Sequence, residues 1–159
     1  MVKEARGRRI VVRGRIAMRK LGSDVARYVN EGGVRARRAL VVGLFGDLGS
    51  GKTTFAQGFA KELGVRERVT SPTFILMRVF LLPQEAAFRR FIHIDAYRIQ
   101  DAREVTALGW ETLATDPETV ILIEWAERVE ALLPNECLRV MFRHRGEKER
   151  EVTIENNNQ

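Results

Sequence analysis

The sequence predicts an α/β fold in which a parallel central sheet carries antiparallel additions. Three observations lead to this prediction. An apolar run at residues 39–45 is followed by a glycine-rich loop and then by a helical pattern. A second apolar run, at residues 120–123, is continuous, as expected for a strand that is buried on both faces. Pairs of short strand-like segments joined by brief turns are typical of antiparallel hairpins.

The first half of the chain contains two helical patterns, each next to a strand-like segment. Residues 9–13 predict a short strand. Residues 18–29 carry apolar side chains at helical spacing, and two glycines end this helix. Residues 39–45 predict a buried strand, and residues 54–63 predict a helix with one apolar stripe that ends at a glycine.

In the second half, strands again alternate with helices. The strands are expected at residues 74–82, 90–95, 120–123, 138–142 and 151–154. The helices are expected at residues 101–114 and 126–132, the second of them stopped by Pro134. The short connections between 74–82 and 90–95, and between 138–142 and 151–154, predict two antiparallel hairpins.

The glycine-rich loop at residues 46–53 fits the pattern G-x-x-x-x-G-K-[ST], which binds the phosphates of nucleoside triphosphates. A strand before it and a helix after it create an anion site, because backbone N–H groups and the helix dipole point at one spot. We therefore expect a P-loop NTPase three-layer sandwich. The expected nucleotide-binding residues of the loop are Asp47, Leu48, Gly49, Ser50, Gly51, Lys52, Thr53 and Thr54.

Hydrolysis of a nucleotide also needs an acid that holds Mg²⁺ or orients water. Asp95 and Glu124 each end an apolar strand, at the edge where open α/β sheets bind ligands. We expect Lys52, Asp95 and Glu124 to be catalytic, and Thr53, Glu124 and Asp95 to hold the metal. Which of the two acids orients the water stays open at this point. His93 is interpreted as a structural residue.

Composition and charge limit the domain organisation, partners and location that the chain can have. The 159 residues suit one domain over 1–155, with a basic segment at 1–15 and a disordered tail at 156–159. The net charge is +6, and residues 1–40 alone carry +9, which fits a contact with RNA or with an acidic protein as well as a solvated surface. The single cysteine, Cys137, is expected to be buried and unreactive. No apolar run has the length of a membrane span and no secretory signal is evident, so we expect a cytoplasmic protein.

Taken together, the segments resemble the TsaE family, the small bacterial ATPases of tRNA threonylcarbamoyladenosine biosynthesis. The resemblance extends over roughly residues 16–143, and the order and spacing of the motifs carry it. These motifs are the loop at 46–54, Ser-Pro-Thr-Phe at 71–74, His-Ile-Asp-Ala-Tyr-Arg at 93–98, Glu104 with Leu108 and Gly109, and Ile-Glu-Trp at 123–125.

The resemblance implies binding of ATP with Mg²⁺ and slow hydrolysis. It also implies TsaB and TsaD as partners, in a machine that modifies adenosine 37 of tRNA, with tRNA contacted indirectly and no membrane involved. By position it adds Thr73, in a nucleotide-responsive loop, and Trp125, near the nucleotide. From spacing alone, Thr73 fits a sensor of the γ-phosphate and a simple turn equally well. The arginine-rich start and the C-terminal hairpin depart from the family pattern, so adenine-contacting residues are not assigned.

Two alternatives to an accessory ATPase stay open. One is a small-molecule P-loop kinase, although the chain has no obvious insertion for an acceptor site or a lid. The other is a nucleotide-gated binding module in which turnover is incidental. A GTPase is disfavoured because the chain lacks an Asn-Lys-x-Asp motif. Arg98 and Arg128 are the arginines in segments suited to an arginine finger, and a partner could supply one instead.

Overall fold

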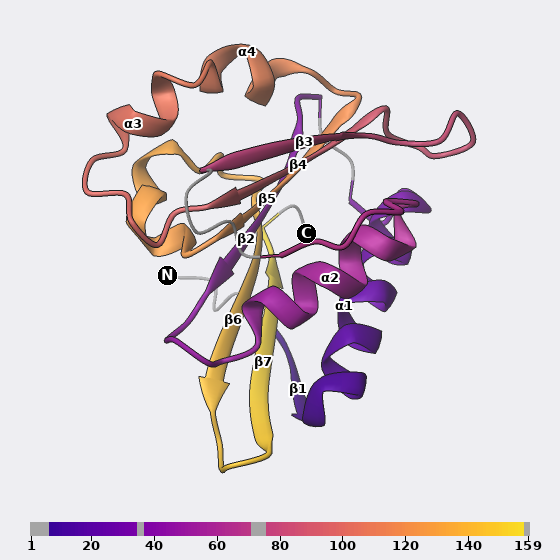
Figure 1. Cartoon of the computed structure of the whole chain (residues 1–159), viewed down its shortest axis with the longest axis vertical. Coiled ribbons are helices and arrows are strands. Elements are labelled where there is room, and N and C mark those ends of the chain that lie inside the picture. Colours follow the sequence, from indigo (N-terminus) through magenta and orange to yellow (C-terminus); the bar gives the residue numbers. More distant parts are fainter. Residues whose placement is uncertain (1–6, 35–36, 71–75, 158–159) are drawn as a thin grey trace.

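The computed structural model describes residues 7–34, 37–70 and 76–157. These residues form a seven-stranded sheet in the order β1-β7-β6-β2-β5-β4-β3 (Figure 1). The strands are β1 (Arg8–Arg13), β2 (Leu40–Phe45), β3 (Met77–Leu81), β4 (Arg90–Asp95), β5 (Thr119–Glu124), β6 (Leu138–His144) and β7 (Glu149–Asn156). The helices are α1 (Gly14–Asn30), α2 (Lys52–Glu62), α3 (Arg103–Thr106), α4 (Trp110–Thr115) and the 3-10 helix η1 (Ala126–Leu132).

The sheet confirms the predicted parallel centre with antiparallel additions. β2 pairs in parallel with β5 and β6, and β5 pairs in parallel with β4. The β3–β4 and β6–β7 hairpins are antiparallel, as expected. β1 adds a further antiparallel strand beside β7, so that the sheet extends beyond its parallel core on both sides.

Helices cover both faces of the sheet and create three layers. Along β2, the side chains of Leu40, Val42 and Leu44 enter the core formed with α1 and α2. Val41 and Phe45 enter the opposite core, which α3, α4 and η1 close. This alternation follows from the two-residue repeat of a strand, and both faces are apolar because both are covered. Among the described residues, no helix is both long and apolar enough to span a membrane.

Two glycines let α1 and α2 approach each other closely. A Cβ atom placed on Gly58 would lie 2.0 Å from the carbonyl oxygen of Arg19, and one on Gly22 would lie 2.1 Å from that of Phe55. Any side chain here would force the two helices apart. Because α2 begins at the glycine-rich loop, this contact also fixes how the loop is held against α1.

Several element boundaries differ from the predictions. The helix expected at residues 101–114 is two short helices, because Gly109 adopts a left-handed φ of +89° at the start of α4. Leu108, in the turn between these two short helices, is exposed. β7 extends to Asn156, so the first residue of the predicted tail belongs to a strand. Residues 74 and 75 of the predicted strand 74–82 lie outside the described residues, and β3 begins at Met77.

Candidate nucleotide-binding site

A pocket of about 580 Å³ lies where the carboxyl ends of β4 and β5 face the glycine-rich loop. The loop forms one wall, and the ends of the two strands form another. The start of α1 and the turn of the β6–β7 hairpin close the opposite side. The volume falls in the range of small-molecule sites, roughly 300–1,000 Å³. The position agrees with the general rule that open α/β sheets bind ligands beyond the carboxyl ends of their strands.

Glycines give the loop its conformation at the start of α2. Gly51 has a φ of +102° and precedes the first helical residue, Lys52. A residue with a Cβ atom would be strained at this φ, and it would also crowd the side chain of Met18 at 2.9 Å. The first N–H groups of any α-helix have no partner within the helix, so the start of α2 offers them to an anion.

Lys52 is almost fully buried, and its ammonium group is held by the loop itself. Its Nζ donates to the carbonyl oxygens of Gly46 at 2.5 Å and Asp47 at 2.7 Å, and to Ser50 Oγ at 3.2 Å. The indole ring of Trp125 lies 4.0 Å from the same nitrogen. Burial lowers the pKa of Lys52, and nearby carboxylates, Glu127 foremost, oppose that shift. The loop thus keeps a positive charge at the floor of the pocket.

Thr53, Glu124 and His93 form a continuous chain of hydrogen bonds beside Lys52. Thr53 Oγ1 donates to Glu124 Oε1 at 2.7 Å, and His93 Nε2 lies 2.7 Å from Glu124 Oε2. Glu124 is 1% exposed and His93 is fully buried. Both oxygens of the carboxylate therefore have partners from two different elements, α2 and β4.

Asp95 lies next to Glu124 because β4 and β5 are paired in parallel register at these two residues. Its Oδ1 accepts a hydrogen bond from the backbone N–H of Tyr97 at 3.0 Å, and the residue lines the pocket. The described residues contain no group of three or more histidine, cysteine or acidic side chains that could hold a metal. Thr53 and the two carboxylates fit Mg²⁺, which uses one or two carboxylates and takes its other ligands from phosphates and water.

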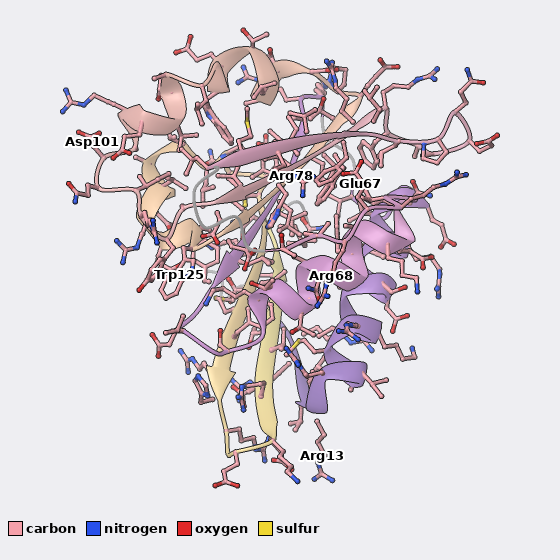
Figure 2. The ribbon with its side chains drawn as sticks, in the orientation of Figure 1. Arg13, Glu67, Arg68, Arg78, Asp101 and Trp125 are labelled. Atoms are coloured by element: carbon pink, nitrogen blue, oxygen red, sulfur yellow. The ribbon has the colours of Figure 1, made fainter. Side chains whose placement is uncertain are left out.

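Trp125 follows Glu124 in a strained backbone conformation. With φ of 58°, it is the one non-glycine residue at positive φ in the described part of the chain. Its ring packs on Tyr97 at 5.0 Å between centroids, and the Arg128 guanidinium lies 5.7 Å from the ring centroid. Figure 2 shows Trp125 at the edge of the molecule beside the loop that leads into α2. Such strain in a non-glycine residue is concentrated at functional sites.

The β6–β7 hairpin holds the outer side of the glycine-rich loop, a contact that the sequence analysis missed. His144 Nε2 lies 3.2 Å from the carbonyl oxygen of Leu48, and Arg150 donates to the carbonyl oxygen of Gly49 at 3.2 Å. The N–H of Gly14, at the start of α1, donates to Lys148 O at 3.0 Å. His144 and Arg150 thus contact carbonyl groups on the outer side of the loop. The contact partners of the loop are 96 and 101 residues away in sequence, so no local pattern indicates them.

The structure brings most of the predicted site residues to this one pocket. The pocket is lined by Leu48, Gly49, Ser50, Gly51, Lys52, Thr53, Thr54, Asp95, Glu124 and Trp125. Asp47 contributes a carbonyl to Lys52. Thr73 lies outside the described residues. Arg98 and Arg128 are not among the described residues that line the pocket.

Comparisons with known proteins agree with these features. A family model described as threonylcarbamoyl adenosine biosynthesis protein TsaE matches residues 13–152. The tRNA threonylcarbamoyladenosine biosynthesis protein TsaE of Bacillus subtilis is 40% identical over 117 residues, which are 72% of this chain and 68% of that protein. The protein of the same name from Treponema pallidum is 33% identical over 131 residues, 82% of this chain and 93% of that protein. The crystal structure of Bacillus subtilis YdiB has a TM-score of 0.65 and 27% identity, and covers 96% of this chain and 88% of that chain.

Proposed function

The chain belongs to the TsaE family of tRNA threonylcarbamoyladenosine biosynthesis proteins, and on this premise we propose that it binds ATP with Mg²⁺ and hydrolyses it slowly during that biosynthesis. The observation that carries this proposal is the 2.7 Å hydrogen bond between Thr53 and Glu124, next to Lys52. A hydroxyl in the first turn of the helix and a carboxylate at the end of a neighbouring strand are the pair that holds Mg²⁺ in P-loop NTPases.

The residues of the loop bind the triphosphate. Backbone N–H groups of the loop and of the start of α2 contact the β- and γ-phosphates. Lys52 exchanges its three contacts within the loop for contacts with phosphate oxygens, which are stronger because they join opposite charges. Arg15, at the start of α1, and Lys148, in the turn of the β6–β7 hairpin, also line the pocket, and we assign these two residues to the nucleoside.

Glu124 and Asp95 have different roles at the phosphate end of the pocket. Both oxygens of Glu124 already have partners, so we assign Glu124 to the metal side of the site, together with Thr53. Asp95 lies beside it on β4, and we assign it to orient the attacking water. When bound, Mg²⁺ neutralises negative charge that develops on the β- and γ-oxygens.

We further propose that the chain works with TsaB and TsaD and meets tRNA only through them. The test is ATP turnover by the purified chain, measured alone and with TsaB, TsaD and tRNA, together with the yield of modified adenosine. Faster turnover with the partners, and modification that requires the chain over repeated cycles, support the accessory ATPase. Turnover that the partners leave unchanged, combined with ATP-dependent docking, supports the nucleotide-gated module instead. Absence of Mg²⁺-dependent nucleotide binding would refute both.

A further inference from the structure

His93 is the one member of the Thr53–Glu124–His93 chain for which the proposed function has no task. It lies in the middle of β4, and its side chain is on the same face of the sheet as that of Asp95, because strand side chains alternate. The imidazole is fully buried, and its Nε2 lies 2.7 Å from Glu124 Oε2. A buried histidine with a buried carboxylate as its partner is not explained by packing alone.

The second ring nitrogen indicates which way the hydrogen bond runs. His93 Nδ1 is buried and has no hydrogen-bond partner among the described residues. A proton on Nδ1 would therefore leave a buried N–H group unsatisfied, and it would turn the Nε2 lone pair toward the negatively charged carboxylate. With the proton on Nε2, the ring donates to the carboxylate, and Nδ1 is left as an unfilled acceptor in place of an unsatisfied N–H. His93 thus donates its proton to Glu124.

The ring is also held in one orientation. Phe91, two residues earlier on the same face of β4, lies parallel to the imidazole, with an interplanar angle of 8° and 6.4 Å between centroids. The donor is therefore fixed by the strand and by a neighbouring aromatic ring rather than by a mobile loop. Residues that form a hydrogen bond with a metal ligand without contacting the metal orient that ligand and influence its affinity for the metal.

We propose that His93 is a positioning residue, which holds the Glu124 carboxylate so that Oε1 faces Thr53, where this oxygen would help to hold the Mg²⁺ of a bound nucleotide. Glutamate has three side-chain torsions, and the contact with Thr53 alone fixes only one of its oxygens. The hydrogen bond from His93 fixes the other. This inference rests on the proposed binding of ATP with Mg²⁺, and it adds a residue outside the wall of the pocket.

The test compares three variants, His93→Leu, His93→Asn and His93→Gln. In glutamine the amide nitrogen lies near the position of Nε2, whereas in asparagine it stops near Nδ1, and leucine has no donor. Affinity for ATP is measured with Mg²⁺ and with EDTA, and the Mg²⁺ concentration for half-maximal turnover is determined. His93→Leu and His93→Asn should need about 10–100 times more Mg²⁺, as is usual when an outer partner of a metal site is removed. His93→Gln should stay within about threefold of the wild type, and affinity in EDTA should hardly change in any variant.

Each result decides the question. A folded His93→Leu protein with wild-type Mg²⁺ dependence overturns the inference while leaving the proposed function intact. If His93→Leu does not fold, the contrast between asparagine and glutamine decides, because both are polar and a packing role would not rank glutamine close to the wild type by Mg²⁺ dependence. Equal Mg²⁺ dependence of those two variants overturns the inference. A wild-type protein that shows no Mg²⁺-dependent binding of ATP overturns the inference together with the proposed function.

Discussion

Replacing Lys52 by methionine should remove ATP turnover without destabilising the fold at neutral pH. The ammonium group has three donors, and in the nucleotide-free protein all three contact the loop. In the transition state they would contact charge on the transferred phosphate. Removing one preorganised donor of this kind lowers kcat by about 10²–10³-fold, and the loss of a charged partner should also weaken ATP binding by about 10–100-fold.

The stability of this variant follows from the pKa of Lys52. Burial lowers that pKa below its ordinary value of 10.5, and the surrounding carboxylates offset the shift only in part. Between the lowered value and 10.5, the unfolded chain binds more protons than the folded protein, so the stability contributed by Lys52 rises with pH across this window. Below the window the buried charge contributes unfavourably. The stability of the methionine variant relative to the wild type should therefore fall as the pH is raised from neutral to about 10.5, the upper end of this window.

The assays are phosphate release, ATP binding and unfolding in urea at the two pH values. Lys61→Met is a matched control, because Lys61 is an exposed lysine in the last turn of the same helix. The control should retain turnover, and its free energy of unfolding should show no such trend between the two pH values. Turnover within about threefold of wild type in Lys52→Met would refute the assignment of Lys52 to the phosphates. A large loss of stability at neutral pH would contradict the conclusion that the buried charge of Lys52 is unfavourable for folding.

Three further predictions test other parts of the structure. Gly58→Ala should lower the free energy of unfolding, measured in urea, by about 1–3 kcal/mol or more, because the added Cβ would lie 2.0 Å from a backbone oxygen. Gly146→Ala is the control and should have almost no effect, because the space around Gly146 is open. Equal stabilities of the two variants would contradict the tight contact between α1 and α2. Arg150→Met should weaken ATP binding, measured by titration, about 3–10-fold, because it removes a hydrogen-bond donor to a carbonyl of the loop. Arg143→Met, at an exposed position of the same hairpin, should leave the affinity unchanged. Equal affinities of the two variants would mean that the contact of Arg150 with the loop does not matter for binding. Burial raises the pKa of Cys137 to about 12, so a thiol reagent near pH 8 should label the native protein only as fast as it unfolds; rapid labelling would contradict this burial.

The sequence predicted those parts of the site that depend on local patterns. The strand, loop and helix around Lys52 could be predicted because the fixed spacing of the glycine-rich motif lies between an apolar run typical of a strand and an apolar stripe typical of a helix. Glu124 and Asp95 were found because each ends an apolar run, and the topology brings the carboxyl ends of these parallel strands to one edge. Local pattern and chemistry point to the same residues at these positions.

Other parts could not be predicted, because they depend on register and on distant contacts. His93 was interpreted as structural, and its contact with the carboxylate of Glu124 was not predicted because this contact depends on the parallel pairing of β4 with β5. His93 and Asp95 are two residues apart, so the sequence placed both side chains on one face of the strand. Without the register of β4 against β5, this spacing did not indicate a partner for His93. The break at Gly109 was missed because its neighbours have helical propensities, although a glycine near the end of a pattern often marks a helix boundary.

The pairing of β1 with β7 has a consequence for synthesis on the ribosome. Residues 8–13 leave the ribosome early, but their partner in the sheet is residues 149–156. At about 5–20 residues per second, the first strand waits on the order of 7–30 s for that partner. Arg150, which braces the glycine-rich loop, lies in the same late strand. A nascent chain therefore contains the complete glycine-rich loop long before it contains the contacts that hold this loop in shape, and we expect tight nucleotide binding only after the last strand has been added.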